Sequence, residues 1–172
     1  MTTFIVQPGD YAPFHEGYVS LVKDEEIMDY LHQQGDAFAE FLGNLPKDKE
    51  DFAYADGKWT VKQLVQHVID TERIFAFRLL ALSRGEQQPI PGFEQEDYAD
   101  AVDVSGRSFE DQRKEFLSAR DATLTLVNSI SPDEAARRGT VSGYPLVARA
   151  VPHIIAGHLE HHLRVLHTKY GL

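Results

Sequence analysis

Cysteine is absent from the 172 residues of this chain. Without cysteine the protein can form no disulfide, no thiolate metal site and no cysteine nucleophile. Any thiol that takes part in a reaction must therefore come from outside the chain. The absence also fits a cytoplasmic protein, which is the location we expect.

Long apolar segments are missing as well. The chain has no run of eighteen apolar residues, so we expect no transmembrane helix. Its first ten residues lack the basic segment followed by an apolar one that marks a signal peptide. The composition is otherwise that of an ordinary globular protein, with 42% apolar and 26% charged residues.

Basic residues are few relative to acidic ones. The chain has 17 lysines and arginines against 27 aspartates and glutamates, which gives a formal net charge of −10. Binding to nucleic acid requires a basic surface that neutralises phosphates, so we expect no nucleic-acid partner. An acidic membrane surface would repel such a chain too. The expected ligand is a small molecule, a metal ion or another protein.

Apolar residues recur at helical spacing through most of the chain. Ile27, Leu31, Phe38 and Leu42, for example, fall near one helical face. We therefore predict long helices over residues 24–42, 61–82, 109–130 and 145–169, and a short helix over residues 95–101. No convincing strand and no internal repeat is present, and residues 133–144 are predicted to be a polar connection.

Capping residues support two of these helix starts. Thr60 with Gln63 forms a capping-box pattern, and Ser108 with Asp111 can cap the third long helix. Pro152 lies inside the last segment, so that helix is either kinked there or begins nearby. Gly171 is a plausible stop.

Four long helices with one short extra helix predict an all-α protein, a four-helix bundle. The length is that of one domain, and we expect a single domain over residues 1–172. Residues 1–20 are punctuated by proline and glycine and are predicted to form an irregular N-terminal segment.

Histidines in the last helix suggest a metal site. His158 and His162 are four residues apart, so on a helix they lie on one face, together with Val151, Ile154 and Val165. That face is apolar and should point toward the core. Two imidazoles placed in this way can share one metal ion.

A third ligand is available on another apolar helix. His67 lies two turns into the segment that begins at Val61, and burying it there requires a partner. If the two helices face each other, His67, His158 and His162 could bind a divalent ion such as Zn²⁺ or Ni²⁺. Three protein ligands would leave a position open for water or substrate, as in catalytic sites.

The alternative is that these are histidines at the edge of the core, hydrogen-bonded to carbonyls or carboxylates. Known motifs fit less well than the three-histidine site. The position after His158 is Leu159 rather than the glutamate of H-E-x-x-H proteases. Glu160 and Glu72 lack the histidine three residues later that di-iron bundles need.

The remaining histidines are interpreted as structural or exposed. His15 and His32 are expected at the surface or in structural roles. His153 and Glu160 should point away from the apolar face of the last helix, and His161 is rotated off the line of His158 and His162. A ligating histidine usually donates its other N–H to an acceptor, and Asp70, Thr71 and Glu72 are the candidates near His67 in the sequence; no general base is identifiable.

Three stretches carry a resemblance to a known family. They read W-T-V-K-Q-L-V-Q-H-V-I-D-T-E-R, P-G-F-E-Q-E-D-Y and V-P-H-I-I-A-G-H-L-E-H-H-L-R-V-L. From about Tyr18 to Tyr170 the chain resembles the DinB-like superfamily and the YfiT-type metal-dependent hydrolases related to it. The resemblance implies an up-down-down-up four-helix bundle, commonly dimeric. It also implies a nickel or zinc ion held by three histidines, here His67, His158 and His162.

Two functions are therefore weighed. The first is a metal-dependent enzyme, either a hydrolase or a transferase that uses a low-molecular-weight thiol, as the resemblance implies for some relatives. Its partner would be a small-molecule substrate, with the protein itself a homodimer. The second is a non-catalytic metal-binding or stress-response bundle. A substrate-sized cavity beside the metal would favour the enzyme, and a sealed apolar surround would favour the alternative.

Overall fold

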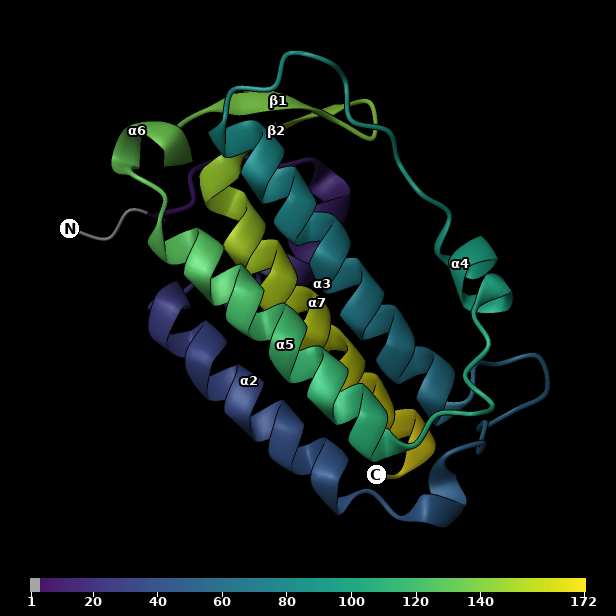
Figure 1. Ribbon diagram of the computed structural model, residues 1–172. Coiled ribbons are helices and arrows are strands. Elements are labelled where there is room, and N and C mark those ends of the chain that lie inside the picture. Colours follow the sequence, from purple (N-terminus) through teal and green to yellow (C-terminus); the bar gives the residue numbers. More distant parts are fainter. Residues whose placement is uncertain (1–3) are drawn as a thin grey trace.

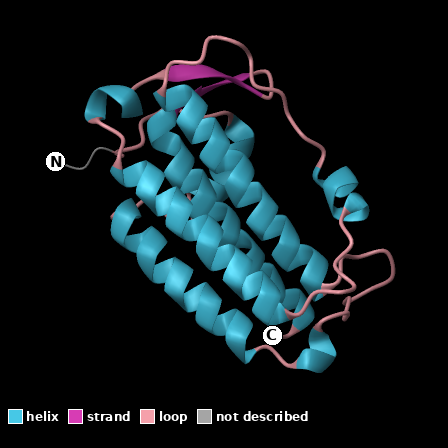
Figure 2. Ribbon diagram, viewed as in Figure 1, coloured by secondary structure: helices cyan, strands magenta, loops and turns pink. Residues whose placement is uncertain are grey.

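Four long helices form the body of the protein (Figure 1). The computed structural model describes residues 4–172; the first three residues of the predicted N-terminal segment lie outside them. The bundle consists of α2 (Ile27–Asn44), α3 (Val61–Ser83), α5 (Phe109–Asn128) and α7 (Val151–Val165). Helices make up most of the described chain (Figure 2).

The order and directions of these helices define the topology. α5 packs against both α2 and α3, and α7 completes the ring by packing against the same two helices. α2 and α7 run one way along the bundle, and α3 and α5 run the other way (Figure 1). The predicted up-down-down-up four-helix bundle is confirmed.

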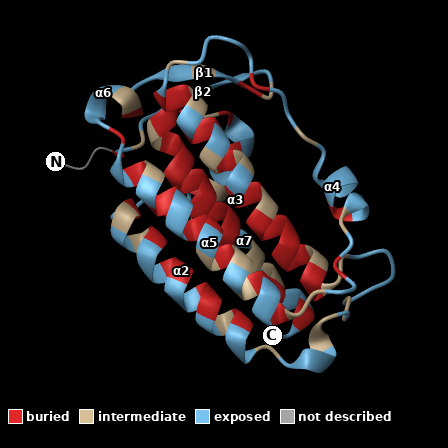
Figure 3. Cartoon of the chain, viewed as in Figure 1, coloured by how far each residue is buried: buried red, intermediate tan, exposed pale blue. Residues whose placement is uncertain are grey.

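The apolar stripes predicted from the sequence face the interior (Figure 3). On α2, Ile27, Leu31, Phe38 and Leu42 are all buried. α3 is buried on most of its sides, as expected for a helix that contacts both α5 and α7. Burial of these stripes supplies the main driving force for assembling the helices.

Both predicted helix caps are present, and each forms a full capping box. The Thr60 hydroxyl accepts a hydrogen bond from the Gln63 amide at 3.2 Å, and the Gln63 side chain accepts one from the Thr60 amide at 2.9 Å. Ser108 and Asp111 make the same reciprocal pair at the start of α5. Each satisfies backbone donors that a helix start leaves unpaired, which places these starts where the sequence predicts them.

A long connection separates α3 from α5. Residues 84–108 run along the outside of the bundle from one end to the other, and include the short helix α4 (Gln95–Ala101) (Figure 1). The predicted bounds of α4 agree with the structure. This crossover allows α3 and α5 to run in the same direction.

The prediction of a polar connection over residues 133–144 was wrong. A short helix, α6 (Pro132–Ala135), is followed by an antiparallel hairpin of β1 (Arg138–Val141) and β2 (Tyr144–Val147). Ser142 and Gly143 form its two-residue turn with φ of 52° and 81°. Positive φ at both positions is typical of the turns that suit hairpin twist.

The hairpin also corrects the start of the last helix. α7 begins at Val151 after a 3-10 turn over Ala148–Ala150, not at residue 145. Pro152 lies in its first turn, where a missing N–H costs nothing, so it marks a start and not a kink. After α7 a π-helical turn over Leu166–Tyr170 ends at Gly171, which has a φ of 69°.

The N-terminal segment closes one side of the bundle. It contains a 3-10 turn at Pro13–His15 and the single-turn helix α1 (Glu16–Val19), which packs on α7. Within residues 4–172 no helix combines the length and the apolar character needed to cross a membrane.

Candidate metal centre

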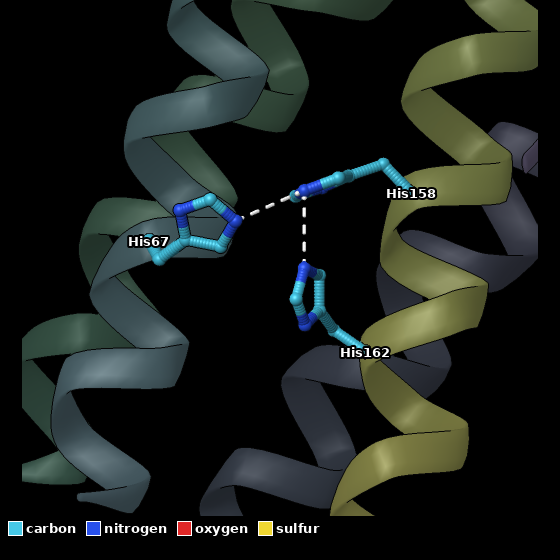
Figure 4. Close-up of side chains that lie close together, drawn as sticks. All are labelled: His67, His158 and His162. Carbon is cyan, nitrogen blue, oxygen red and sulfur yellow. Dashed lines mark hydrogen bonds between the residues drawn. The ribbon is translucent and has the colours of Figure 1, made fainter. Parts of the chain in front are cut away.

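His67 from α3 and His158 and His162 from α7 meet between these two helices (Figure 4). The Nε2 atom of His158 lies 3.1 Å from the Nε2 of His67 and 3.1 Å from the Nε2 of His162. One nitrogen from each ring lies within 4.8 Å of the other two. The structure therefore brings together the three histidines that the sequence singles out.

Hydrogen bonding alone does not account for this geometry. A neutral imidazole nitrogen carries either one proton or one lone pair, so Nε2 of His158 can make one good hydrogen bond, not two. Nitrogens bound to one tetrahedral ion at 2.0–2.1 Å lie about 3.3 Å apart. The observed 3.1 Å separations are close to that value, so the three rings fit a shared ion.

Burial keeps the three rings uncharged, which is the form that binds metal. Burial lowers the pKa of His67 from 6.5 to about 4. It lowers the pKa of His162 to about 3, with smaller contributions from the neighbouring His67 and His161. The pKa of His158 is held well below its usual value, again mainly by burial.

Neighbouring side chains hold the His67 ring in place. The Nδ1 atom of His67 lies 3.4 Å from the Thr71 hydroxyl, one turn further along α3. With Nε2 on an ion, Nδ1 would carry the proton and donate it to that oxygen. The indole of Trp59 packs against His67 at 4.9 Å between ring centroids. Of the three candidates that follow His67 in the sequence, Thr71 is the one that lies beside its Nδ1 atom.

The other two candidates serve elsewhere. Glu72 accepts hydrogen bonds from two nitrogens of Arg120, at 2.7 and 2.9 Å. Asp70 accepts a hydrogen bond from Gln66 at 3.0 Å. Neither carboxylate is bonded to the three histidines: Glu72 joins α3 to α5 through Arg120, and Asp70 bonds to side chains of α3 itself.

A close helix contact positions Tyr18 over the site. The Tyr18 ring meets His158 edge-on, with ring centroids 5.4 Å apart. α1 can approach α7 this closely because residue 157 is glycine. A Cβ atom there would lie 2.1 Å from the Tyr18 carbonyl oxygen, well inside van der Waals contact.

A pocket of about 290 Å³ opens beside the histidines. It is lined by His67 and His158 and by the aromatic side chains of Phe14, Phe75 and Phe93. The polar side chains that line it are those of His15, Tyr18, Thr71, Arg78, Glu94, Gln95 and Ser142. A pocket of this size suits a small molecule.

A larger cavity of about 770 Å³ lies between the N-terminal segment and the ends of α2 and α5, and shares no residue with the three-histidine site.

Two histidines differ from the prediction. His15, expected at the surface, is buried and lines the pocket. His153, expected to point away from the core, is also buried, because the N-terminal segment packs on that side of α7. His32 and His161 are exposed, as expected. The roles of His15 and Arg78 could not be predicted from the sequence, since both depend on how separate segments fold around the pocket.

Comparison with known proteins identifies the family. A profile of the DinB superfamily matches residues 30–166. A curated protein of Oceanobacillus iheyensis, named "putative metal-dependent hydrolase OB0413", is 26% identical over 153 residues, covering 86% of each chain.

Two solved structures share the fold. YfiT from Bacillus subtilis, described as "a probable metal-dependent hydrolase with an unusual four-helix bundle topology", superposes with a TM-score of 0.75 at 13% identity and 99% coverage of both chains. The DinB-like protein YjoA of Bacillus subtilis gives a TM-score of 0.58 at 14% identity, covering 83% of this chain and 88% of its own. With the profile match over most of its length, the chain belongs to the DinB superfamily.

Proposed function

We propose that the protein is a metal-dependent enzyme whose divalent ion, Zn²⁺ or Ni²⁺, is held by His67, His158 and His162. The observation that carries the proposal is the position of His158 Nε2, 3.1 Å from a ring nitrogen on each side. Three neutral imidazoles in that arrangement suit a divalent transition metal. Three protein ligands would leave a coordination position for water or a substrate from the pocket that His67 and His158 line.

A bound ion would supply Lewis-acid chemistry, which lowers the pKa of a water or thiol that reaches it and makes it a nucleophile near neutral pH. The chain's own residues hold and shield the reacting groups. Phe14, Phe75 and Phe93 provide apolar walls against which a substrate can pack. Thr71 fixes the orientation of the His67 ring.

His15 is the candidate proton acceptor in the pocket. Burial, followed by the nearby charge of Arg78, lowers its pKa to about 4, so the ring is neutral at pH 7. Its Nδ1 atom is buried and has no hydrogen-bond partner among residues 4–172. Glu72 is a poor candidate because both of its oxygens are bonded to Arg120.

Two reaction classes fit the site. Hydrolysis is supported by the names given to the Oceanobacillus iheyensis relative and to YfiT. Transfer to a low-molecular-weight thiol requires a thiol from outside, since the chain has no cysteine. In both cases the partner is a small molecule. We propose further that the protein acts as a homodimer, as the family resemblance implies, and that it works in the cytoplasm, which the absence of cysteine fits.

The pocket also bears on the non-catalytic alternative. A bundle that only stores metal would surround it with sealed apolar packing. Here the histidines border an opening lined by aromatic and polar groups. That feature favours an enzyme.

Metal content tests the site. We expect purified protein to contain about one divalent ion per chain by elemental analysis, and His158→Ala to lose it. His161→Ala is the matched control, because His161 is exposed on the same helix and should leave the metal in place. Stoichiometric metal retained in His158→Ala would contradict the assignment.

Activity tests the reaction class. Metal-loaded protein should be screened against ester and amide substrates, and for conjugation of electrophiles with small thiols. We expect turnover in one of these assays and its loss when the three histidines are replaced. Turnover that survives their removal would refute the metal mechanism.

A further inference from the structure

Arg78 lies in the same pocket as the three-histidine site. It follows His67 by eleven residues on α3, which is three helical turns, so both side chains leave the same face of the helix. Their backbone positions are about 16 Å apart at 1.5 Å per residue, and helical side chains tilt toward the N-terminus, here toward His67. The pocket spans the space between them.

The guanidinium is buried without an anionic partner. Arg78 is only 4% exposed. Its hydrogen-bond acceptors are the Ser142 hydroxyl at 3.3 Å and the Pro91 carbonyl at 3.5 Å, both neutral and both distant. The Nε atom is buried and has no partner within the described chain. No carboxylate oxygen of residues 4–172 lies within the 4.0 Å ion-pair distance of Arg78.

A second buried arginine shows how this fold satisfies such a charge. Arg120 is 2% exposed, and it makes a two-pronged ion pair with Glu72 and a further bond to the Leu31 carbonyl at 2.8 Å. Burying an unpaired charge is costly, so a buried arginine normally has such a partner. Arg78 has no such partner within residues 4–172, and its side chain lines the pocket.

The surroundings of Arg78 do not neutralise it. The ring centroids of Phe75 and Phe93 lie 4.9 and 5.7 Å from the guanidinium carbon. Attraction between these ring faces and the cation offsets only part of the cost of burying the charge. Burial lowers the pKa of Arg78, yet an arginine stays protonated in proteins. His15, close enough to feel this charge, is uncharged at neutral pH. Glu94 lines the pocket but is exposed and forms no ion pair with Arg78.

We infer that the pocket recognises a small molecule through a carboxylate, which the Arg78 guanidinium binds while the reacting group points toward His67 and His158. A planar carboxylate matches the two-pronged donor geometry of arginine. Its single charge is balanced by one guanidinium. A phosphate dianion would require more positive charge than this acidic chain places in the pocket. The inference rests on the proposed function in taking this pocket as the substrate site.

Titrations of carboxylates and their neutral amides test the recognition of a carboxylate by Arg78 in the full-length protein. Acetate, succinate and phenylacetate are titrated beside their neutral amides and beside inorganic phosphate, with binding followed by NMR in zinc-loaded and metal-free protein. We expect each carboxylate that binds to do so about ten- to hundredfold more tightly than its amide, the range of a charge-assisted hydrogen bond. Arg78→Gln should bring that ratio to about one.

Two further variants keep the test interpretable. Arg84→Gln removes an exposed arginine from the end of the same helix, where it pairs with Glu134, and should leave the ratio unchanged. Arg78→Lys keeps the positive charge but lacks the two-pronged donor geometry of arginine, so it should retain a smaller preference for the carboxylate over the amide. This variant provides the test if Arg78→Gln does not fold. A melting curve for each variant establishes that it is folded.

Several results would overturn the inference. One is that none of the three carboxylates binds more tightly than its amide, and another is that the preference for the carboxylate persists in Arg78→Gln. Tighter binding of phosphate than of the carboxylates would also contradict it. A preference seen only in zinc-loaded protein would place the carboxylate on the metal. The metal assignment is tested separately. Arg78→Gln should keep its metal, whereas loss of the metal site with an intact preference in metal-free protein would refute the proposed function alone.

Discussion

Glu72 and Arg120 form an ion pair in the interior of the bundle, where α3 faces α5. Both side chains are buried, and the guanidinium uses two nitrogens on the two carboxylate oxygens. The pair is close to the metal centre in sequence, since Glu72 follows His67 by five residues, but its contacts are structural. It shows that a buried acidic residue near a site need not take part in the chemistry.

Replacing Glu72 by glutamine should be strongly destabilising. The change leaves Arg120 as a buried charge without its counterion, and removing one partner of a buried pair costs about 3–5 kcal/mol. Chemical denaturation of the metal-free protein measures this loss. Glu110→Gln is the matched control, because Glu110 makes an exposed pair with Arg113 on α5 and should change stability by less than about 1 kcal/mol. Equal effects of the two changes would contradict the structural role of Glu72.

Acid should destabilise the protein through its buried histidines. Burial lowers the pKa of His153 to about 4, against 6.5 when the chain is unfolded. Between these two pH values the unfolded chain binds more protons than the folded chain, so the free energy of unfolding rises with pH. The stability that the neutral His153 contributes is therefore lost as the pH falls from about 6.5 toward about 4. One such group contributes at most roughly 1.4 kcal/mol per pH unit.

The variant His153→Gln should therefore reduce the slope of unfolding free energy against pH in that window. Denaturation at several pH values in metal-free protein provides the measurement, since His153 lies apart from the three-histidine cluster. His32→Gln, an exposed histidine, should leave the slope unchanged. An unchanged slope in His153→Gln would mean that His153 is not buried in the neutral form.

The sequence was informative about residues whose role depends on one helix, and less so about residues whose role depends on several segments. His158 and His162 lie on an apolar face, so their inward direction followed from helical geometry alone. His15 precedes α1 in an irregular segment, and its burial follows only from the packing of that segment on α7. Arg78 lies on an apolar helix, but nothing local indicated that it lacks a carboxylate.

Among the elements, the contact between α1 and α7 bears directly on the site. Gly157→Ala would place a methyl group against the Tyr18 carbonyl, at a distance that requires the two helices to separate. Overpacking of this kind costs about 1–3 kcal/mol. We expect a lower melting temperature and a displaced Tyr18 ring, seen as altered NMR shifts of His158.

Gly17→Ala serves as the control for that change. Gly17 belongs to α1 itself, and a Cβ there would meet nothing within 4 Å. Alanine is favoured over glycine in a helix, so this variant should be neutral or slightly stabilising. Full stability in Gly157→Ala would show that the helices do not meet this closely.

The starts of α3 and α5 were predicted well because capping residues mark them, whereas the start of α7 was predicted poorly. Thr60 and Ser108 fixed the starts of α3 and α5. The hairpin was missed because strands of four residues are too short to show alternation, and residues 145–147 continued the apolar pattern of α7. The Ser142–Gly143 turn was the one local signal that could have revealed it.

At the scale of the whole molecule, topology explains how residues ninety positions apart form one site. The crossover over residues 84–108 leaves α3 beside α7, and these two helices run in opposite directions (Figure 1). Helical periodicity predicted which face of each helix is buried but not which helices are neighbours. The family resemblance supplied that arrangement, and the structure confirms it.

Because the three ligands come from two helices, metal binding should stabilise the whole bundle. An ion that binds only the folded chain adds about 2.7 kcal/mol when its free concentration is one hundred times the dissociation constant. We therefore expect a chelator to lower the melting temperature, and added Zn²⁺ or Ni²⁺ to restore it. His158→Ala should melt at the same temperature with and without metal, whereas His161→Ala should respond like the unaltered protein. If chelation left the melting temperature of the unaltered protein unchanged, His67 and His158 would not be joined through an ion, and the contact between α3 and α7 would depend on apolar packing alone.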